Sequence, residues 1–195
     1  MLNFKLKLLL TLLSVLPLAV QAQFNNQYCN SEIPTQHPAS QYTDNSDGTV
    51  TDNRTGLMWK KCSLGQNDLD CTGNPVLLNW KNAHLAAEAA NTQAFAGYTN
   101  WRLPNIKELM SLAERSCEAP AINLSIFPIT QNNPEGSYND SASFWSSSPY
   151  YFESSVEANS RATMLDFGND SSGTYPVGID KTEPMQALLV RDTSE

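Results

Sequence analysis

The sequence has few of the residues on which most enzyme sites depend. It contains two histidines and four cysteines in 195 residues. The serines at 146–148 lack the Gly-x-Ser-x-Gly context of a hydrolase nucleophile. Neither His37 nor His84 has a Cys, Ser or acidic partner at a spacing that indicates acid–base catalysis. We therefore expect no catalytic residues, no cofactor and no enzymatic activity.

Basic residues are also scarce. The full chain carries 12 Lys and Arg against 20 Asp and Glu, a net charge of −8. Only Lys60 and Lys61 form a basic pair, and an acidic surface repels polyanions. This balance argues against nucleic acid as a partner.

Long apolar runs are confined to the N-terminus. Lys5 and Lys7 precede an apolar run from Leu8 to Val20, and Ala22 follows with a small side chain. The run is too short for a membrane span, which needs about 20 apolar residues, and is typical of a signal peptide. We predict a signal peptide at 1–22, an N-terminal arm at 23–40 and one domain at 41–195. The mature chain would be periplasmic or extracellular, with no membrane span and a net charge of −10, because cleavage removes two lysines.

The four cysteines all follow the predicted cleavage site. An even count in an exported chain predicts two disulfides, for which three connectivities exist. The short polar stretch between Cys62 and Cys71 suits a local bridge, which leaves Cys29 for Cys117. A zinc site is disfavoured because there is no Cys-x-x-Cys pair.

The acidic segment at 44–52 invites comparison with a calcium loop. Counted from Asp44, glycine falls at the fifth position rather than the sixth, so the EF-hand register fails. A noncanonical calcium site at Asp44, Asp47 and Asp52 stays open, but a plain turn at Asp47-Gly48 explains the pattern better. We predict no metal site.

Periodicity and turn residues predict the order of the elements. A β-hairpin at 41–52 continues into 57–59, helices follow at 80–90 and from 106 to about 116, and strands are expected at 144–148, 161–167 and 187–191. Asn79 and Asn105 are the predicted N-caps, the latter with Glu108 in a capping box. This order indicates an α+β domain with a mostly antiparallel sheet and two short helices. The expected core residues are Trp59, Trp101, Leu103, Leu109, Trp145 and Leu189.

Five ordered blocks in the sequence resemble one known family. They are Thr-Asp-Asn-Ser-Asp-Gly-Thr-Val-Thr-Asp-Asn-Arg-Thr-Gly-Leu-Met-Trp at 43–59, Gly-Tyr-Thr-Asn-Trp-Arg-Leu-Pro-Asn-Ile-Lys-Glu-Leu at 97–109, Pro-Ala-Ile-Asn-Leu-Ser-Ile-Phe-Pro at 120–128, Phe-Trp-Ser-Ser-Ser-Pro at 144–149 and Leu-Val-Arg at 189–191. Together they are similar to the Lcl C-terminal domain family of bacteria, over most of the mature chain.

The resemblance implies a C-type-lectin-like fold, distantly related to formylglycine-generating enzymes, and the Cys62–Cys71 bridge. It also implies a binding role, because the family includes a collagen-like adhesin that binds sulfated glycosaminoglycans. This chain has no Gly-x-y stalk and is acidic, so neither trimerisation nor a sulfated ligand carries over. Its oligomeric state is not indicated.

The function expected from these observations is a secreted, noncatalytic binding module for carbohydrate or another cell-surface ligand. An envelope protein that binds another protein is the alternative, and a formylglycine-generating-type enzyme is disfavoured because no cysteine follows Cys117. Aromatic rings with nearby amides and carboxylates suit sugars. We therefore expect the ligand at the late loops rather than at the histidines, with strand-end packing as the competing role of the aromatics. The residues are Tyr150, Tyr151, Phe152, Glu153, Asn169 and Asp170.

Overall fold

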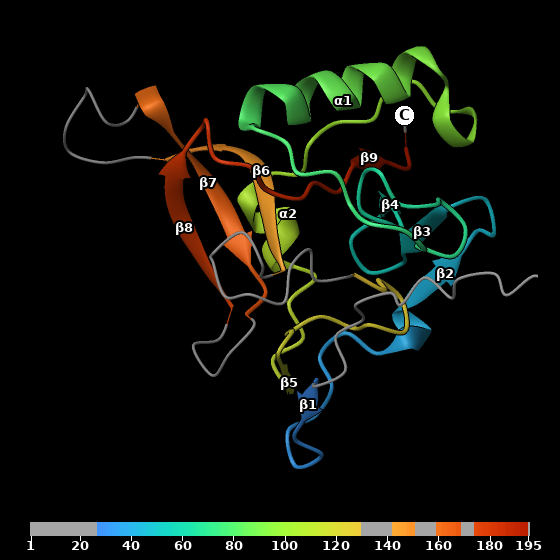
Figure 1. Ribbon diagram of the computed structural model, residues 1–195. Coiled ribbons are helices and arrows are strands. Elements are labelled where there is room, and N and C mark those ends of the chain that lie inside the picture. Colours follow the sequence, from blue (N-terminus) through green and yellow to red (C-terminus); the bar gives the residue numbers. More distant parts are fainter. Residues whose placement is uncertain (1–26, 130–141, 151–158, 169–173, 195) are drawn as a thin grey trace, which may run out of the picture.

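The computed structural model describes residues 27–129, 142–150, 159–168 and 174–194. In these residues the chain forms three antiparallel sheets and two α-helices (Figure 1). The predicted α+β class is confirmed. The predicted signal peptide lies outside the described residues, and among the described helices none has the length and apolarity to cross a membrane.

The first large sheet has the strand order β2-β3-β4-β9. It contains β2 (Tyr42–Asp44), β3 (Thr49–Asp52), β4 (Leu57–Lys60) and β9 (Val190–Asp192). The hairpin predicted at Asp47-Gly48 is present, and Gly48 has a φ of +89° that favours glycine. A Cβ on Gly48 would also lie 2.9 Å from the carbonyl oxygen of Asp68, so the turn packs closely against the loop after β4.

The second large sheet has the order β6-β7-β8. It contains β6 (Ser143–Pro149), β7 (Arg161–Asp166) and β8 (Tyr175–Asp180). The sequence patterns indicated the first two strands but not β8, because Pro176 and Gly178 interrupt its pattern. Both residues are tolerated here since β8 is an edge strand. The last strand of the chain, β9 in the first sheet, also begins later than predicted, at Val190.

The third sheet is a short pair of strands, β1 (Tyr28–Cys29) and β5 (Cys117–Glu118).

The helices begin where their caps predicted. α1 (Trp80–Thr92) starts after Asn79, whose side chain accepts from the Asn82 amide. α2 (Ile106–Met110) starts with the predicted capping box of Asn105 and Glu108. The prediction that this helix reaches about residue 116 is wrong. After Ser111 the backbone turns away, and the Glu114 amide donates to the Ala121 carbonyl instead of to a helical acceptor. The described residues also contain two short 3-10 turns, η1 (Ala39–Gln41) and η2 (Phe95–Gly97).

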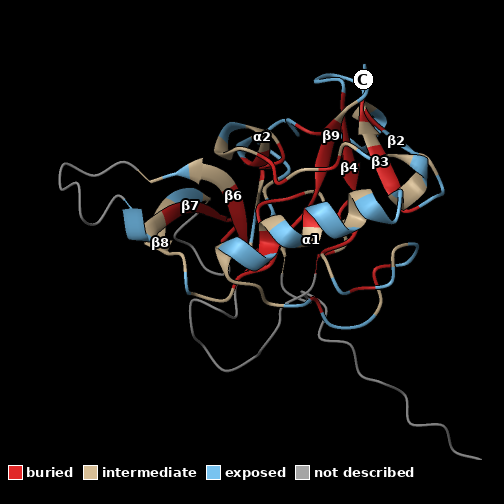
Figure 2. Ribbon diagram, turned by 90° about the horizontal axis from the view of Figure 1, so that it is seen from above, coloured by how far each residue is buried: buried red, intermediate tan, exposed pale blue. Residues whose placement is uncertain are grey.

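The core consists of two clusters of buried side chains, and adjacent residues of β6 and β7 belong to different clusters, so the clusters lie on opposite faces of the β6–β8 sheet. Figure 2 shows that the buried positions gather in the strands and along one side of α1. One part packs α2 against Phe144 and Leu165, and the other packs α1 against Trp145 and Met164. All six core residues expected from the sequence are at most 2% exposed: Trp59, Trp101, Leu103, Leu109, Trp145 and Leu189.

Both predicted disulfides are present. Cys62–Cys71 closes a loop after β4, and Cys29–Cys117 joins the paired strands β1 and β5 across 88 positions of sequence. No free cysteine remains. Two disulfides are compatible with an exported protein.

Candidate functional site

Of the six residues predicted to contact a ligand, only Tyr150 is described. Tyr151, Phe152, Glu153, Asn169 and Asp170 lie outside the described residues. Tyr150 follows the last residue of β6 and is half-buried.

The ring of Tyr150 lies on the backbone of Gly178 in β8. A Cβ placed on Gly178 would come within 2.3–2.4 Å of the Tyr150 ring atoms Cγ, Cδ2 and Cε2, so only glycine leaves room for this ring. Val177 and Ile179 pack into the core on the α1 side. Because side chains alternate along a strand, Gly178 and the ring on it lie on the opposite face. Tyr150 thus packs at a strand end and still keeps part of its surface open.

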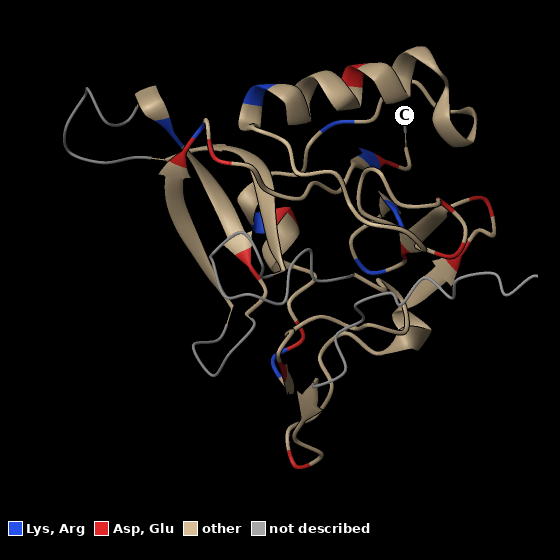
Figure 3. Cartoon of the chain, in the orientation of Figure 1, with Lys and Arg blue, Asp and Glu red and all other residues tan. Residues whose placement is uncertain are grey.

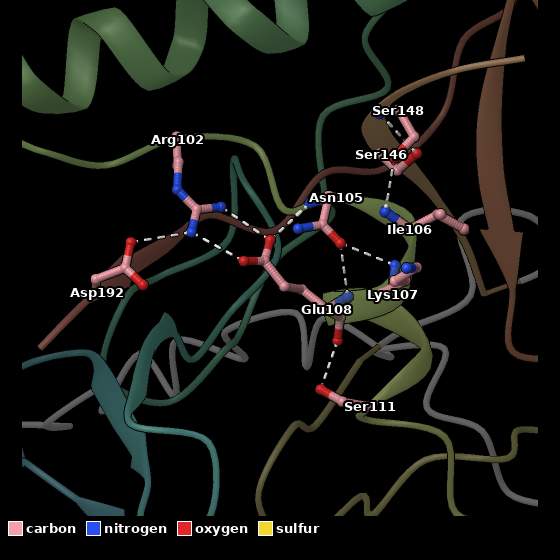
Figure 4. A network of polar contacts seen from close by, with 9 residues as sticks. All are labelled: Arg102, Asn105, Ile106, Lys107, Glu108, Ser111, Ser146, Ser148 and Asp192. Atoms are coloured by element: carbon pink, nitrogen blue, oxygen red, sulfur yellow. Dashed lines mark hydrogen bonds and ion pairs between the residues drawn. The ribbon is translucent and has the colours of Figure 1, made fainter.

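The Trp-Arg-Leu-Pro segment is held by a network of charged groups (Figure 4). The Arg102 guanidinium donates to both oxygens of Glu108, at 2.8 and 2.9 Å, and to Asp192 at 3.1 Å. Glu108 also accepts from the Asn105 amide at 2.7 Å, which closes the capping box. These carboxylates raise the pKa of Arg102. The network joins α2 to β9, so its role is structural.

A groove of about 240 Å³ lies between α1 and β6, and we call it the α1–β6 groove. The residues that line it come from α1, from the Trp101–Leu103 segment and from β6: His84, Ala87, Glu88, Asn91, Trp101, Arg102, Leu103 and Ser147. Neither Glu88 nor Ser147 was predicted to belong to a site. The four-residue spacing of His84 and Glu88 does place both on one helix face, but nothing local indicates that Ser147 joins them.

His84 contributes a neutral imidazole to this groove. Burial lowers its pKa, and Glu88 opposes the shift only in part. The Nε2 atom is buried and has no hydrogen-bond partner among the described residues. The ring packs edge-on against Trp80, with centroids 4.4 Å apart. In the described ranges no hydroxyl lies in hydrogen-bond contact with the imidazole, so its arrangement there is not that of a general base activating a serine.

The second histidine lies in a different cluster, at the N-terminal arm. His37 is 6% exposed, and its Nδ1 is 2.9 Å from a guanidinium nitrogen of Arg54. Its backbone amide donates to Glu114 at 2.8 Å, and the Gln36 amide donates to the same carboxylate at 3.0 and 3.2 Å. Burial lowers the pKa of His37, with Arg54 adding to the shift, while Glu114 and Asp52 oppose it. These partners lie 17 and 77 positions away in the sequence, so no local pattern indicates them.

Acidic positions gather beside the β2–β3 hairpin (Figure 3). Lys61 pairs with Asp44 at 2.7 Å and Lys60 pairs with Asp68. The three residues of the noncanonical calcium hypothesis are engaged elsewhere: Asp44 accepts from Lys61 and Ser46, Asp47 from Thr49, and Asp52 from Gln41 and Arg54. Among the residues that the structure describes, no group of three His, Cys, Asp or Glu side chains is arranged to hold a metal ion.

Fold and site together define a disulfide-bonded α+β domain with an acidic surface and a small polar groove beside α1. The family model of the Lcl C-terminal domain matches residues 48–191. The chain therefore belongs to the Lcl C-terminal domain family, as the resemblance predicted. No curated protein and no solved structure matches it significantly, so the lectin-like description of the fold stays a prediction.

Proposed function

We propose that this protein is a secreted, noncatalytic binding module whose ligand is a carbohydrate or another cell-surface molecule. The observation that carries the proposal is the Tyr150 ring, fixed on Gly178 at the end of the β6–β8 sheet. A ring that is held in place and partly open offers a flat apolar face to a sugar at little cost in conformational entropy.

The state of the reactive residues supports a binding role over catalysis. All four cysteines are in disulfides, so no thiol is available for the cysteine pair that a formylglycine-generating-type enzyme would need. The His37 imidazole contacts Arg54, and no described residue bonds Nε2 of His84. Within the described part of the chain, neither imidazole is paired with a carboxylate or hydroxyl in the way that general acid–base catalysis requires.

A glycan array probed with the mature protein, with and without calcium, tests the proposal. Replacing Tyr150 and Tyr151 together by Ala should weaken binding by at least about tenfold, because the aromatic surface is lost. Gly178→Ala should weaken it as well, since the new methyl group displaces the Tyr150 ring. Tyr175→Ala, which removes an exposed aromatic side chain at the start of β8, is the matched control.

Two results would count against this reading. Binding to glycans that is unchanged in both the Tyr150/Tyr151 and the Gly178 variants would remove Tyr150 from the site. An array without any bound glycan, combined with capture of one defined envelope protein, would favour the alternative role in envelope assembly.

A further inference from the structure

The middle of β6 departs from the regular sheet at its three serines. The β6–β7 register shifts between Trp145 and Pro149, so 146–148 form an irregular segment. The Ser147 amide donates to the Pro104 carbonyl at 2.8 Å instead of to β7. Bulges of this kind re-aim side chains and are frequent beside functional sites.

Two of the three serine hydroxyls are used inside the protein. Ser146 donates to the Thr163 carbonyl, and Ser148 accepts from the Ile106 amide at 3.0 Å. The Ser147 hydroxyl forms no hydrogen bond with any described residue, and Ser147 lines the α1–β6 groove. Ser147 of this irregular segment therefore lines the groove with a hydroxyl that bonds to no other described residue.

The charges around the groove favour a cation. Glu88 is exposed and has no ion-pair partner among the described residues, whereas the Arg102 charge is offset by Glu108 and Asp192. The other nearby guanidinium, Arg191, stacks on Tyr98 and does not line the groove. His84 adds no charge near neutral pH, because its pKa is lowered. The net charge of −8 on the chain further attracts cations.

We propose that the α1–β6 groove binds a primary ammonium group, with the Glu88 carboxylate and the Ser147 hydroxyl as its acceptors. An ammonium has three donors and no acceptor, which matches one carboxylate and one free hydroxyl. Ala87 and Leu103 supply the apolar wall for the carbon chain behind it. The ammonium belongs to a small free amine or to a lysine side chain of a partner protein.

This inference goes beyond the binding role proposed above and does not depend on it. Tyr150 lies on the face of the β6–β8 sheet opposite α1, whereas the groove lies on the α1 side. Loss of glycan binding in a Tyr150 variant and loss of amine binding in a Glu88 variant would therefore report on different sites.

The experiment is a titration of the mature protein followed by backbone-amide NMR. The probes are butylammonium, butanol as a neutral molecule of equal length, and an acetylated and amidated tripeptide with a central lysine. We expect saturable shifts at Ser147 and His84 with butylammonium and with the peptide, and none with butanol. A peptide that binds more tightly than butylammonium assigns the site to a lysine side chain, and equal affinities assign it to a free amine.

Charge-matched variants decide whether the groove itself is responsible. Glu88→Gln should weaken butylammonium binding by about tenfold or more, the cost of losing a charge-assisted hydrogen bond. Ser147→Ala should weaken it less. Asp70→Asn removes one exposed carboxylate from the Cys62–Cys71 loop and should change affinity by less than about twofold, as expected of a distant screened charge. Absence of saturable shifts, equal binding of butanol, or equal losses in the Glu88 and Asp70 variants would overturn the proposal.

Discussion

His37 is buried although it lies in an arm of polar residues and prolines. Its backbone is fixed by Glu114, a carboxylate that also accepts from the amide and hydroxyl of Ser116. Burial raises the pKa of Glu114, but these hydrogen bonds outweigh that effect and lower it overall. The arm is thus held by one carboxylate from the family domain, at the point where the imidazole meets Arg54.

The lowered pKa of His37 predicts acid sensitivity. The unfolded chain takes up a proton near pH 6.5, while the folded state resists it until a lower pH. Stability from this residue is therefore complete above 6.5 and is lost as the pH falls toward the folded pKa. The loss is about 1.4 kcal/mol for each unit between the two pKa values. The pKa of Glu114 is also lowered, so its contribution to stability is present above its ordinary pKa of 4.5 and is lost as the pH falls below that value.

Urea denaturation of the wild type and of His37→Gln at about pH 7 and pH 5 measures this effect. The wild type should lose more unfolding free energy than the variant between the two pH values. An equal loss in both proteins would show that His37 does not titrate in this way. His84→Gln reports separately on the second histidine. Its pKa is also lowered, so it too should destabilise the folded state as the pH falls.

At the scale of elements, the capping box of α2 has a clear energetic consequence. The helix has only five residues, so its stability depends on its ends more than on its length. Asn105 accepts from the amides of Lys107 and Glu108, at 2.9 and 3.0 Å. Asn105→Ala should lower the unfolding free energy by about 1 kcal/mol, within the range for lost N-caps.

A shift of the urea midpoint measures this loss. Asn79→Ala is the comparison, because the Asn79 side chain caps α1 by accepting one hydrogen bond, from the Asn82 amide. The Asn105 variant should lose more, since the Asn105 side chain accepts from two helix amides whereas that of Asn79 accepts from one. A midpoint that is unaffected by Asn105→Ala would mean that Arg102 and packing alone position α2.

Local signals in the sequence predicted the beginnings of elements better than their ends. Side-chain caps determine where both helices start, and these are visible in short stretches of sequence. The end of α2 depends on a bond from Glu114 to Ala121, and β8 depends on an edge that tolerates Pro176. Neither is visible locally.

The candidate site was predicted less completely than the fold. The sequence predicted a strand at 144–148 followed by a loop with Tyr150, and β6 ends at Pro149. The packing of Tyr150 on Gly178, however, requires knowledge of β8. The α1–β6 groove brings together His84 of α1 and Ser147 of β6, and no periodicity links residues so far apart in sequence. Long-range contacts of this kind follow from topology rather than from local propensity.

At the scale of the whole molecule, the family domain is tied together at its two ends. The match begins at residue 48 and ends at residue 191, and β9 pairs with β4 within the first sheet. Arg102 then connects β9 to α2, and α2 packs beneath the second sheet. The N-terminal arm lies outside the match and is attached by Cys29–Cys117, by Glu114 and by Gln27, whose amide donates to two carbonyls.

The two disulfides should therefore contribute unequally to stability. In the chain-entropy description, a bridge stabilises the folded state by restricting the unfolded chain, and the effect grows with the logarithm of the loop length. Cys29–Cys117 spans 88 positions and Cys62–Cys71 spans 9. The corresponding contributions are about 4.6 and about 2.7 kcal/mol.

Replacing both cysteines of one bridge by serine, one pair at a time, tests this order. The Cys29/Cys117 variant should lose about 2 kcal/mol more unfolding free energy in urea than the Cys62/Cys71 variant. Cys62 and Cys71 are, however, buried, at 1% and 4% exposure, whereas Cys29 is exposed. Serine hydroxyls at 62 and 71 would therefore add a desolvation cost, so Cys→Ala versions of both pairs separate the two effects. If the alanine variants of the short loop still lose more than those of the long one, the arm is held mainly by Glu114 and His37, and the bridge adds little to it.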